Sequence, residues 1–145
     1  MSQYLNVYVA SPSGEFVHLV DFSRNHDAYV ALQEVGNFPW EKIKLITPQT
    51  FTDAISYLED MIERFESRNR SWENAKKDVS LISTNKETAQ VALKEIYEID
   101  DTIDQNNNRI NDLEYAIAQL MLLKDIDSPI YAGIEISNPT KDDVI

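Results

Sequence analysis

The fold is decided by two stretches of sequence, FTDAISYLEDMIERFESRNRSWENAKKDV (residues 51–79) and AQVALKEIYEIDDTIDQNNNRINDLEYAIAQL (residues 89–120). Apolar side chains recur every seven residues in both. In the first they are Phe51, Leu58, Phe65, Trp72 and Val79, with Ile55 and Ile62 at the complementary spacing. In the second they are Ala89, Ile96, Ile103, Ile110 and Ile117, interleaved with Ala92, Ile99, Leu113 and Leu120. Such a repeat keeps one face of a helix against a partner helix, so it predicts two long helices that pack against each other, against another copy, or both.

The ends of these helices also carry signals. Thr50 and Asp53 resemble a capping box, and Thr84 with Glu87 forms one, so we expect the chain to break between residues 81 and 85. The pattern therefore predicts an antiparallel, coiled-coil-like helical hairpin over residues 49–126. Two other breaks stay open, at residues 67–71 and 106–108, because both segments are poor in helix-forming residues.

Residues outside the hairpin alternate in the manner of strands. We expect strands near residues 4–10, 15–22, 41–46 and 130–136, and a short helix capped by Ser23 or Asn25. The predicted fold is α+β: a small antiparallel sheet of about four strands, one short helix, and the long hairpin inserted before the last strand. One domain spans residues 1–145, with a head of residues 1–48 and 128–137 and a flexible acidic tail at 138–145.

Charge and composition restrict the function. The net charge is −12, of which −8 lies in residues 83–145, and lysine and arginine are the residues that displace counterions from a phosphate backbone. We therefore expect no direct nucleic-acid binding. Cysteine is absent, which excludes thiolate metal sites and cysteine nucleophiles. No stretch approaches a membrane span, so we expect no membrane contact and a cytoplasmic protein, in the host cytoplasm if the chain is viral.

Polar residues interrupt the apolar seam, by which we mean the heptad positions that face the partner helix. Asn69 and Lys76 occupy such positions in the first helix and Asn106 occupies one in the second. A buried asparagine there sets register or oligomeric state, because only a matched partner satisfies its amide. The alternative is that the seam opens and these side chains are solvated. The candidate register or oligomer residues are Asn69, Ile103, Asn106 and Ile110.

An acidic group on the second helix is the main charged candidate. It comprises Glu98, Asp100, Asp101 and Asp104. A solvated helix face is the default interpretation, and the alternatives are a charged docking face or a mimic of a nucleic-acid backbone. The run from Asp104 starts like a calcium loop but has Arg109 where the loop needs glycine. We expect no metal, no cofactor and no catalytic residue, and a structural or surface role for His18 and His26.

Aromatic residues provide the other candidates for an interaction surface. Phe38 and Trp40 flank Pro39, and Trp72 follows the basic residues Arg68 and Arg70. Aromatic side chains dominate interface energetics when they are exposed, although packing in the core is their default role.

Together these features predict a non-enzymatic protein that binds another protein. Within that class we expect a small inhibitor or adaptor of the kind that phages or mobile elements encode, acting on an unidentified protein partner and forming homo-oligomers. Two alternatives remain. One is an acidic mimic that blocks a nucleic-acid enzyme, and the other is an enzyme or small-ligand binder with a pocket near His18 or Tyr8.

Overall fold

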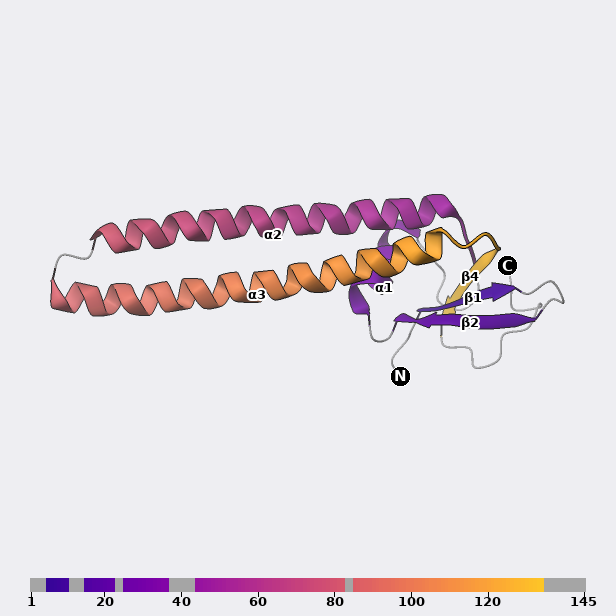
Figure 1. The fold of residues 1–145 in the computed structure, drawn as a ribbon, viewed down its shortest axis with the longest axis horizontal. Coiled ribbons are helices and arrows are strands. Elements are labelled where there is room, and N and C mark those ends of the chain that lie inside the picture. Colours follow the sequence, from indigo (N-terminus) through magenta and orange to yellow (C-terminus); the bar gives the residue numbers. More distant parts are fainter. Residues whose placement is uncertain (1–4, 11–14, 23–24, 37–43, 83–84, 135–145) are drawn as a thin grey trace. The chain divides into compact units, whose positions relative to one another are not determined.

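The computed structural model describes residues 5–10, 15–22, 25–36, 44–82 and 85–134. The elements are β1 (Leu5–Ala10), β2 (Phe16–Asp21), α1 (His26–Gly36), β3 (Lys44–Ile46), α2 (Pro48–Ile82), α3 (Lys86–Lys124) and β4 (Ile130–Ile134) (Figure 1). The chain divides into two compact units, which we call the sheet unit (residues 1–59 and 115–145) and the hairpin unit (residues 60–114). The predicted α+β fold, with a helical hairpin inserted before the last strand, is confirmed.

All pairs of neighbouring strands in the sheet are antiparallel, and the strand order is β2-β1-β4-β3. β1 and β2 pair as the predicted hairpin, with a register shift between Val7 and Tyr8. β4 follows α3 and enters between β1 and β3, where Tyr131 pairs with Tyr8 on one side and with Leu45 on the other. The last described strand is therefore a central one, and the strands that precede α2 hold it on both sides.

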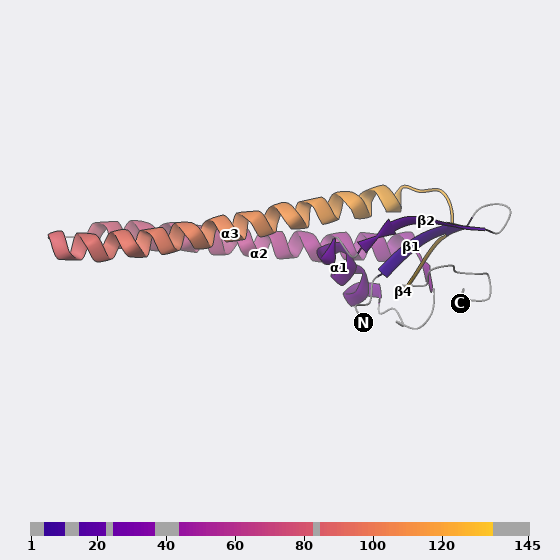
Figure 2. The ribbon, with the colours of Figure 1, turned by 90° about the horizontal axis from the view of Figure 1, so that it is seen from below.

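The core of the sheet unit combines the sheet with α1, the first turns of α2 and the last turns of α3. Its fully buried side chains include Val7, Leu32, Phe51, Ala54, Leu58, Ala116 and Leu120. Figures 1 and 2 both show α1 beside these parts of α2 and α3. The Nδ2 of Asn25 donates to Oε1 of Gln119 at 3.3 Å, and the Oδ1 of Asn25 accepts from the backbone N–H of Ala28. Asn25 thus caps α1, which confirms one of the two predicted caps. Its side chain also joins α1 to α3 by a hydrogen bond.

The two long helices begin at other caps than the sequence suggests. α2 starts at Pro48, and the backbone N–H of Thr50 donates to Oγ1 of Thr47 at 3.3 Å. The prediction of Thr50 as the cap was wrong, because proline is favoured at the first helical position and places the cap one residue before it. Thr84 lies outside the described residues. Asn85 caps α3 instead, by accepting from the N–H of Thr88 at 2.9 Å, and the predicted break between residues 81 and 85 is correct.

In the hairpin unit, α2 and α3 lie side by side and run in opposite directions (Figures 1 and 2). Neither alternative break exists, because α2 continues through residues 67–71 and α3 continues through residues 106–108. Burial is uneven between them. α3 buries Ala92, Ile99, Ile103, Ile110 and Leu113, whereas no side chain of residues 60–80 in α2 is buried. Two helices alone therefore leave the α2 side of their seam partly in water.

Several expectations fall outside what the structure describes. Phe38 and Trp40 lie in the undescribed residues 37–43, and the predicted tail at 138–145 lies in the undescribed residues 135–145. Within the described ranges, no helix combines the length and the apolar character needed to cross a membrane.

Candidate functional site

The polar residues of the seam meet across it. The Nδ2 of Asn106 donates to Oδ1 of Asn69 at 2.9 Å, and the Nδ2 of Asn69 donates to Oδ1 of Asn107 at 3.0 Å. Seven residues further along α2, the Nζ of Lys76 lies 2.8 Å from Oδ1 of Asp100. The structure thus brings Asn69 and Asn106 together. Sequence reasoning missed Asn107 as a partner, because it lies beside the seam and not within it.

These contacts are compatible with one alignment of the helices only. Asn69 to Lys76 is a step of seven residues along α2, and Asn107 to Asp100 is the same step backwards along α3. Sliding either helix by one turn would separate both pairs at once. The hydrogen bond with Asp100, aided by the attraction of that carboxylate, raises the pKa of Lys76, so the ammonium form is held in the folded state.

The acidic candidates divide into one half-buried side chain in an ion pair and three exposed side chains. Asp100 is committed to Lys76, whereas Glu98, Asp101 and Asp104 are exposed. Asp101 accepts from Nε2 of Gln105 one turn along the same helix at 2.9 Å. Across the described residues, no group of three or more histidine, aspartate or glutamate side chains is arranged to hold a metal ion.

Trp72 and the nearby arginines lie on the surface of the hairpin unit. Trp72 occupies a seam position, yet 40% of it is exposed to solvent. Arg64, Arg68 and Arg70 are also exposed, and the part of the chain that the structure describes contains no ion pair for them. A partly exposed tryptophan beside unpaired arginines is the composition found at the centres of protein interfaces.

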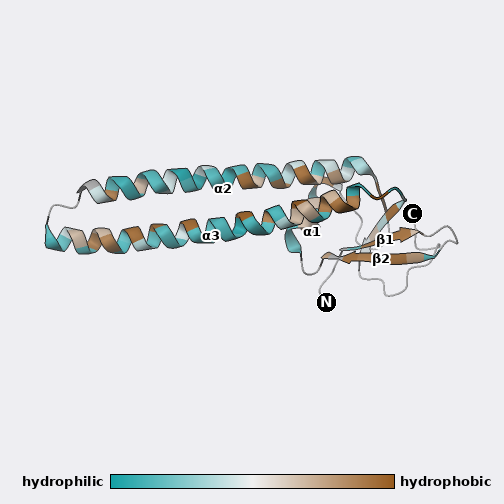
Figure 3. Ribbon diagram, viewed as in Figure 1, coloured by the Kyte–Doolittle hydropathy of each residue, from teal (hydrophilic) through white to brown (hydrophobic). Residues whose placement is uncertain are grey.

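An apolar surface on the last turns of α3 was missed by sequence reasoning. Tyr115, Ala118 and Leu122 are exposed and follow one another at spacings of three and four residues, so they share a face of the helix. Met121 is exposed beside them. Figure 3 shows hydrophobic residues gathered at this end of α3, in contrast to the mostly hydrophilic α2 of the hairpin unit. The spacing of these residues is present in the sequence, but they lie outside the heptad seam on which the prediction of the two helices was based.

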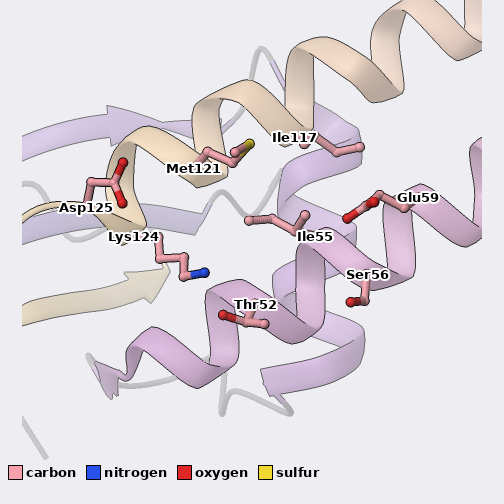
Figure 4. Close-up of a pocket in the computed structure, with 8 residues that line it drawn as sticks. All are labelled: Thr52, Ile55, Ser56, Glu59, Ile117, Met121, Lys124 and Asp125. Carbon is pink, nitrogen blue, oxygen red and sulfur yellow. The ribbon is translucent and has the colours of Figure 1, made fainter.

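A groove between α2 and α3 of the sheet unit adjoins this surface. Its volume is about 440 Å³, and Figure 4 shows Ile55 and Lys124 reaching into the space between the two helices. The lining residues are Thr52, Ile55, Ser56, Glu59, Ile117, Met121, Lys124 and Asp125. Apolar side chains form its centre, and charged and hydroxyl side chains surround them. No protein-family model, curated protein or solved structure matches this chain.

The residues proposed for an enzymatic or small-ligand pocket lie elsewhere. Tyr8 is buried in β1, and its ring centroid lies 5.3 Å from that of the exposed His18 in β2. The Nε2 of His18 lies 3.3 Å from Oδ1 of Asn6. Neither residue lines the groove described above or a smaller one of about 170 Å³ between β3, β4 and the ends of α2 and α3. His18 and Tyr8 are register partners of β1 and β2 and contact each other there.

Proposed function

We propose that this chain is a non-enzymatic protein-binding protein, and that the end of α3 in the sheet unit takes an amphipathic helix of its partner. The observation that carries the proposal is the run of exposed apolar side chains Tyr115, Ala118, Met121 and Leu122, of which Leu122 is 72% exposed. Isolated apolar residues are ordinary on a protein surface. A contiguous set beside a groove is characteristic of an interaction site.

The groove supports a helical occupant. Two helices form its walls, and a third helix laid along them would bury apolar residues at spacings of three and four, which is the helix-in-groove mode of recognition. Met121 is one of the lining residues, and methionine adapts to differently shaped partners because its side chain is flexible and polarisable. Glu59 at the rim favours a basic residue at one end of the bound helix.

Nucleic-acid mimicry receives less support. It rests on the acidic residues of α3, and one of them, Asp100, is already bound to Lys76. A small inhibitor or adaptor from a phage or mobile element stays a proposal within the protein-binding class.

The binding surface can be tested with displayed peptides. A library of helical peptides with randomised faces is selected against the full chain, and we expect binders with apolar residues at i, i+3 or i+4, and i+7. Met121→Asp with Leu122→Asp should abolish their binding. Val17→Asp with Leu19→Asp is the control, because it also places two carboxylates on exposed apolar positions of the sheet unit but lies in β2, outside the lining of the groove.

Two results would contradict the proposal. One is a selection that yields no helical binder. The other is a set of binders that tolerates the substitutions at Met121 and Leu122 while circular dichroism shows that the variant keeps its helix content.

A further inference from the structure

Two exposed stripes in the hairpin unit complement each other in charge and in apolar character. On α2, Arg64, Arg68 and Trp72 follow at spacings of four residues, which places them on one face. We call this the basic stripe. On α3, Leu93, Tyr97, Asp101 and Asp104 follow at spacings of four, four and three. We call this the acidic stripe, and all of its side chains are exposed, Tyr97 to 72%.

The stripes match in length and in order when the helices run antiparallel. Arg64 to Trp72 spans about 12 Å and Tyr97 to Asp104 about 11 Å at a rise of about 1.5 Å per residue. Setting Trp72 against Tyr97 brings Arg68 level with Asp101 and Arg64 level with Asp104. One alignment thus forms an aromatic contact and two ion pairs together.

The chain's own hairpin cannot form this alignment. Asn69 is bonded to Asn106, so three residues further on Trp72 is level with Ile103. Tyr97 lies six residues beyond Ile103 along α3, a displacement of about 9 Å. The hydrogen bonds at Asn69 and the ion pair at Lys76 fix this offset, and they leave the two stripes out of step within one molecule.

We infer that a second copy of this chain binds here, with the basic stripe of each copy against the acidic stripe of another. The argument rests on charge complementarity between two surfaces of the same chain. It involves neither the apolar end of α3 nor its groove, so it stands independently of the proposed function.

A single contact of this kind is small. Stable protein interfaces bury more than roughly 1,000 Å² in total, and one contact over about three helical turns falls below that. Each copy must therefore use both of its stripes, or the association is weak and increases with concentration. The expected dissociation constant lies between about 1 μM and about 1 mM.

Charge reversal with complementation provides the test. Sedimentation equilibrium of the wild type up to about 1 mM should show a mean mass above the monomer. Arg64→Glu with Arg68→Glu, and separately Asp101→Arg with Asp104→Arg, should each weaken association by about tenfold or more, because like charges then face each other. Mixing the two variants should restore it, because each supplies the charge that the other lacks.

The controls separate the stripes from net charge. Arg70→Glu with Lys77→Glu changes the charge by the same amount as the reversal of Arg64 and Arg68, but lies on another face of α2 and should leave association unchanged. For α3, Glu95→Arg with Glu98→Arg is the corresponding control. Net repulsion between acidic chains predicts that removing negative charge at Asp101 and Asp104 strengthens association, which is opposite to our expectation.

Three outcomes would overturn the inference: a wild type that stays monomeric at every concentration, a stripe reversal that behaves like its control, or a mixture that fails to associate. Circular dichroism checks that each variant folds. If a single-stripe variant does not fold, a chain with all four reversals keeps the complementarity with its signs exchanged. It should then associate like the wild type, and a monomer would contradict the inference.

Discussion

α2 carries phenylalanine at the same heptad position in both units, and the two side chains have different surroundings. Phe51, in the sheet unit, is 1% exposed, whereas Phe65, fourteen residues later in the hairpin unit, is only half-buried. The difference comes from what lies beyond the partner helix. In the sheet unit α1 and the sheet supply a further layer, while within the hairpin unit each helix packs only on the other. The same seven-residue repeat thus yields a sealed core in one unit and a seam open to water in the other.

The seam itself also differs. Between residues 51 and 58 the buried positions of α2 are Phe51, Ala54 and Leu58, all apolar. In the hairpin unit, Asn69 and Lys76 occupy seam positions that alternate with Phe65 and Trp72. Polar pairs contribute less free energy than packed apolar side chains but tolerate only one alignment. We expect the sheet unit to contribute most of the free energy of folding. In the hairpin unit, we expect the polar pairs chiefly to fix the alignment of the two helices.

The largest expected effect tests this difference directly. Phe51→Ala should lower the free energy of unfolding by about 3–5 kcal/mol, because it removes a fully buried ring and leaves a cavity. Phe65→Ala should cost less than about 2 kcal/mol, because part of that ring already contacts water. Urea unfolding followed by circular dichroism measures both. Equal losses would mean that the two units bury their seams to the same depth.

The sequence was informative where local pattern and long-range packing agree. The heptads of α2 and α3, the alternation in the strands and the break before Asn85 all follow from neighbours within a few residues, and the structure has them. The place of β4 between β1 and β3 does not follow from local pattern, because pairing of distant strands depends on how the helices return the chain. The sequence supported a fourth strand but not its neighbours.

The candidate site was less predictable for a physical reason. Whether Asn69 is solvated or bonded depends on which residue lies opposite, and its partners Asn106 and Asn107 lie more than thirty-five residues away. The exposed surface at Tyr115 and Leu122 was missed because its apolar residues follow the heptad region without belonging to its seam. A search for a second apolar face on α3 would have found it.

Substitution of the asparagine pair should change the free energy of unfolding less than Phe51→Ala does. Asn106→Leu leaves the Oδ1 of Asn69 without its donor and should cost about 1 kcal/mol, since the site is only half-buried. Replacing Asn69 and Asn106 together by leucine should return the free energy of unfolding to the wild-type value or raise it above that value, because the seam becomes apolar there.

The double variant should also lose the preference for a single alignment of α2 and α3. With the amides gone, only the pair of Lys76 and Asp100 distinguishes the alignments, and we expect more than one register or oligomeric state. Two-dimensional NMR of the hairpin amides would then show additional or broadened signals. A double variant with a single sharp set of signals and the mass of the wild type would show that apolar packing alone fixes the register.

The smallest expected effect concerns pH. The pKa of Lys76 is raised above its ordinary value of 10.5, chiefly by its hydrogen bond with Asp100. A group whose pKa is higher in the folded state contributes stability below its unfolded pKa and loses it as pH rises through the folded value. We therefore expect hydrogen exchange in the hairpin unit to report a small loss of protection above about pH 10.5. Lys76→Arg keeps its charge at that pH and should shift the loss to higher pH, whereas Lys77→Arg, at an exposed neighbouring position, should not. The sheet unit should lose protection of its own in this range, because burial raises the pKa of Tyr29 in α1 above its ordinary value of 10.0. The comparison with Lys76→Arg within the hairpin unit is therefore the decisive one, and a loss that is unchanged in Lys76→Arg would mean that Lys76 is not its source.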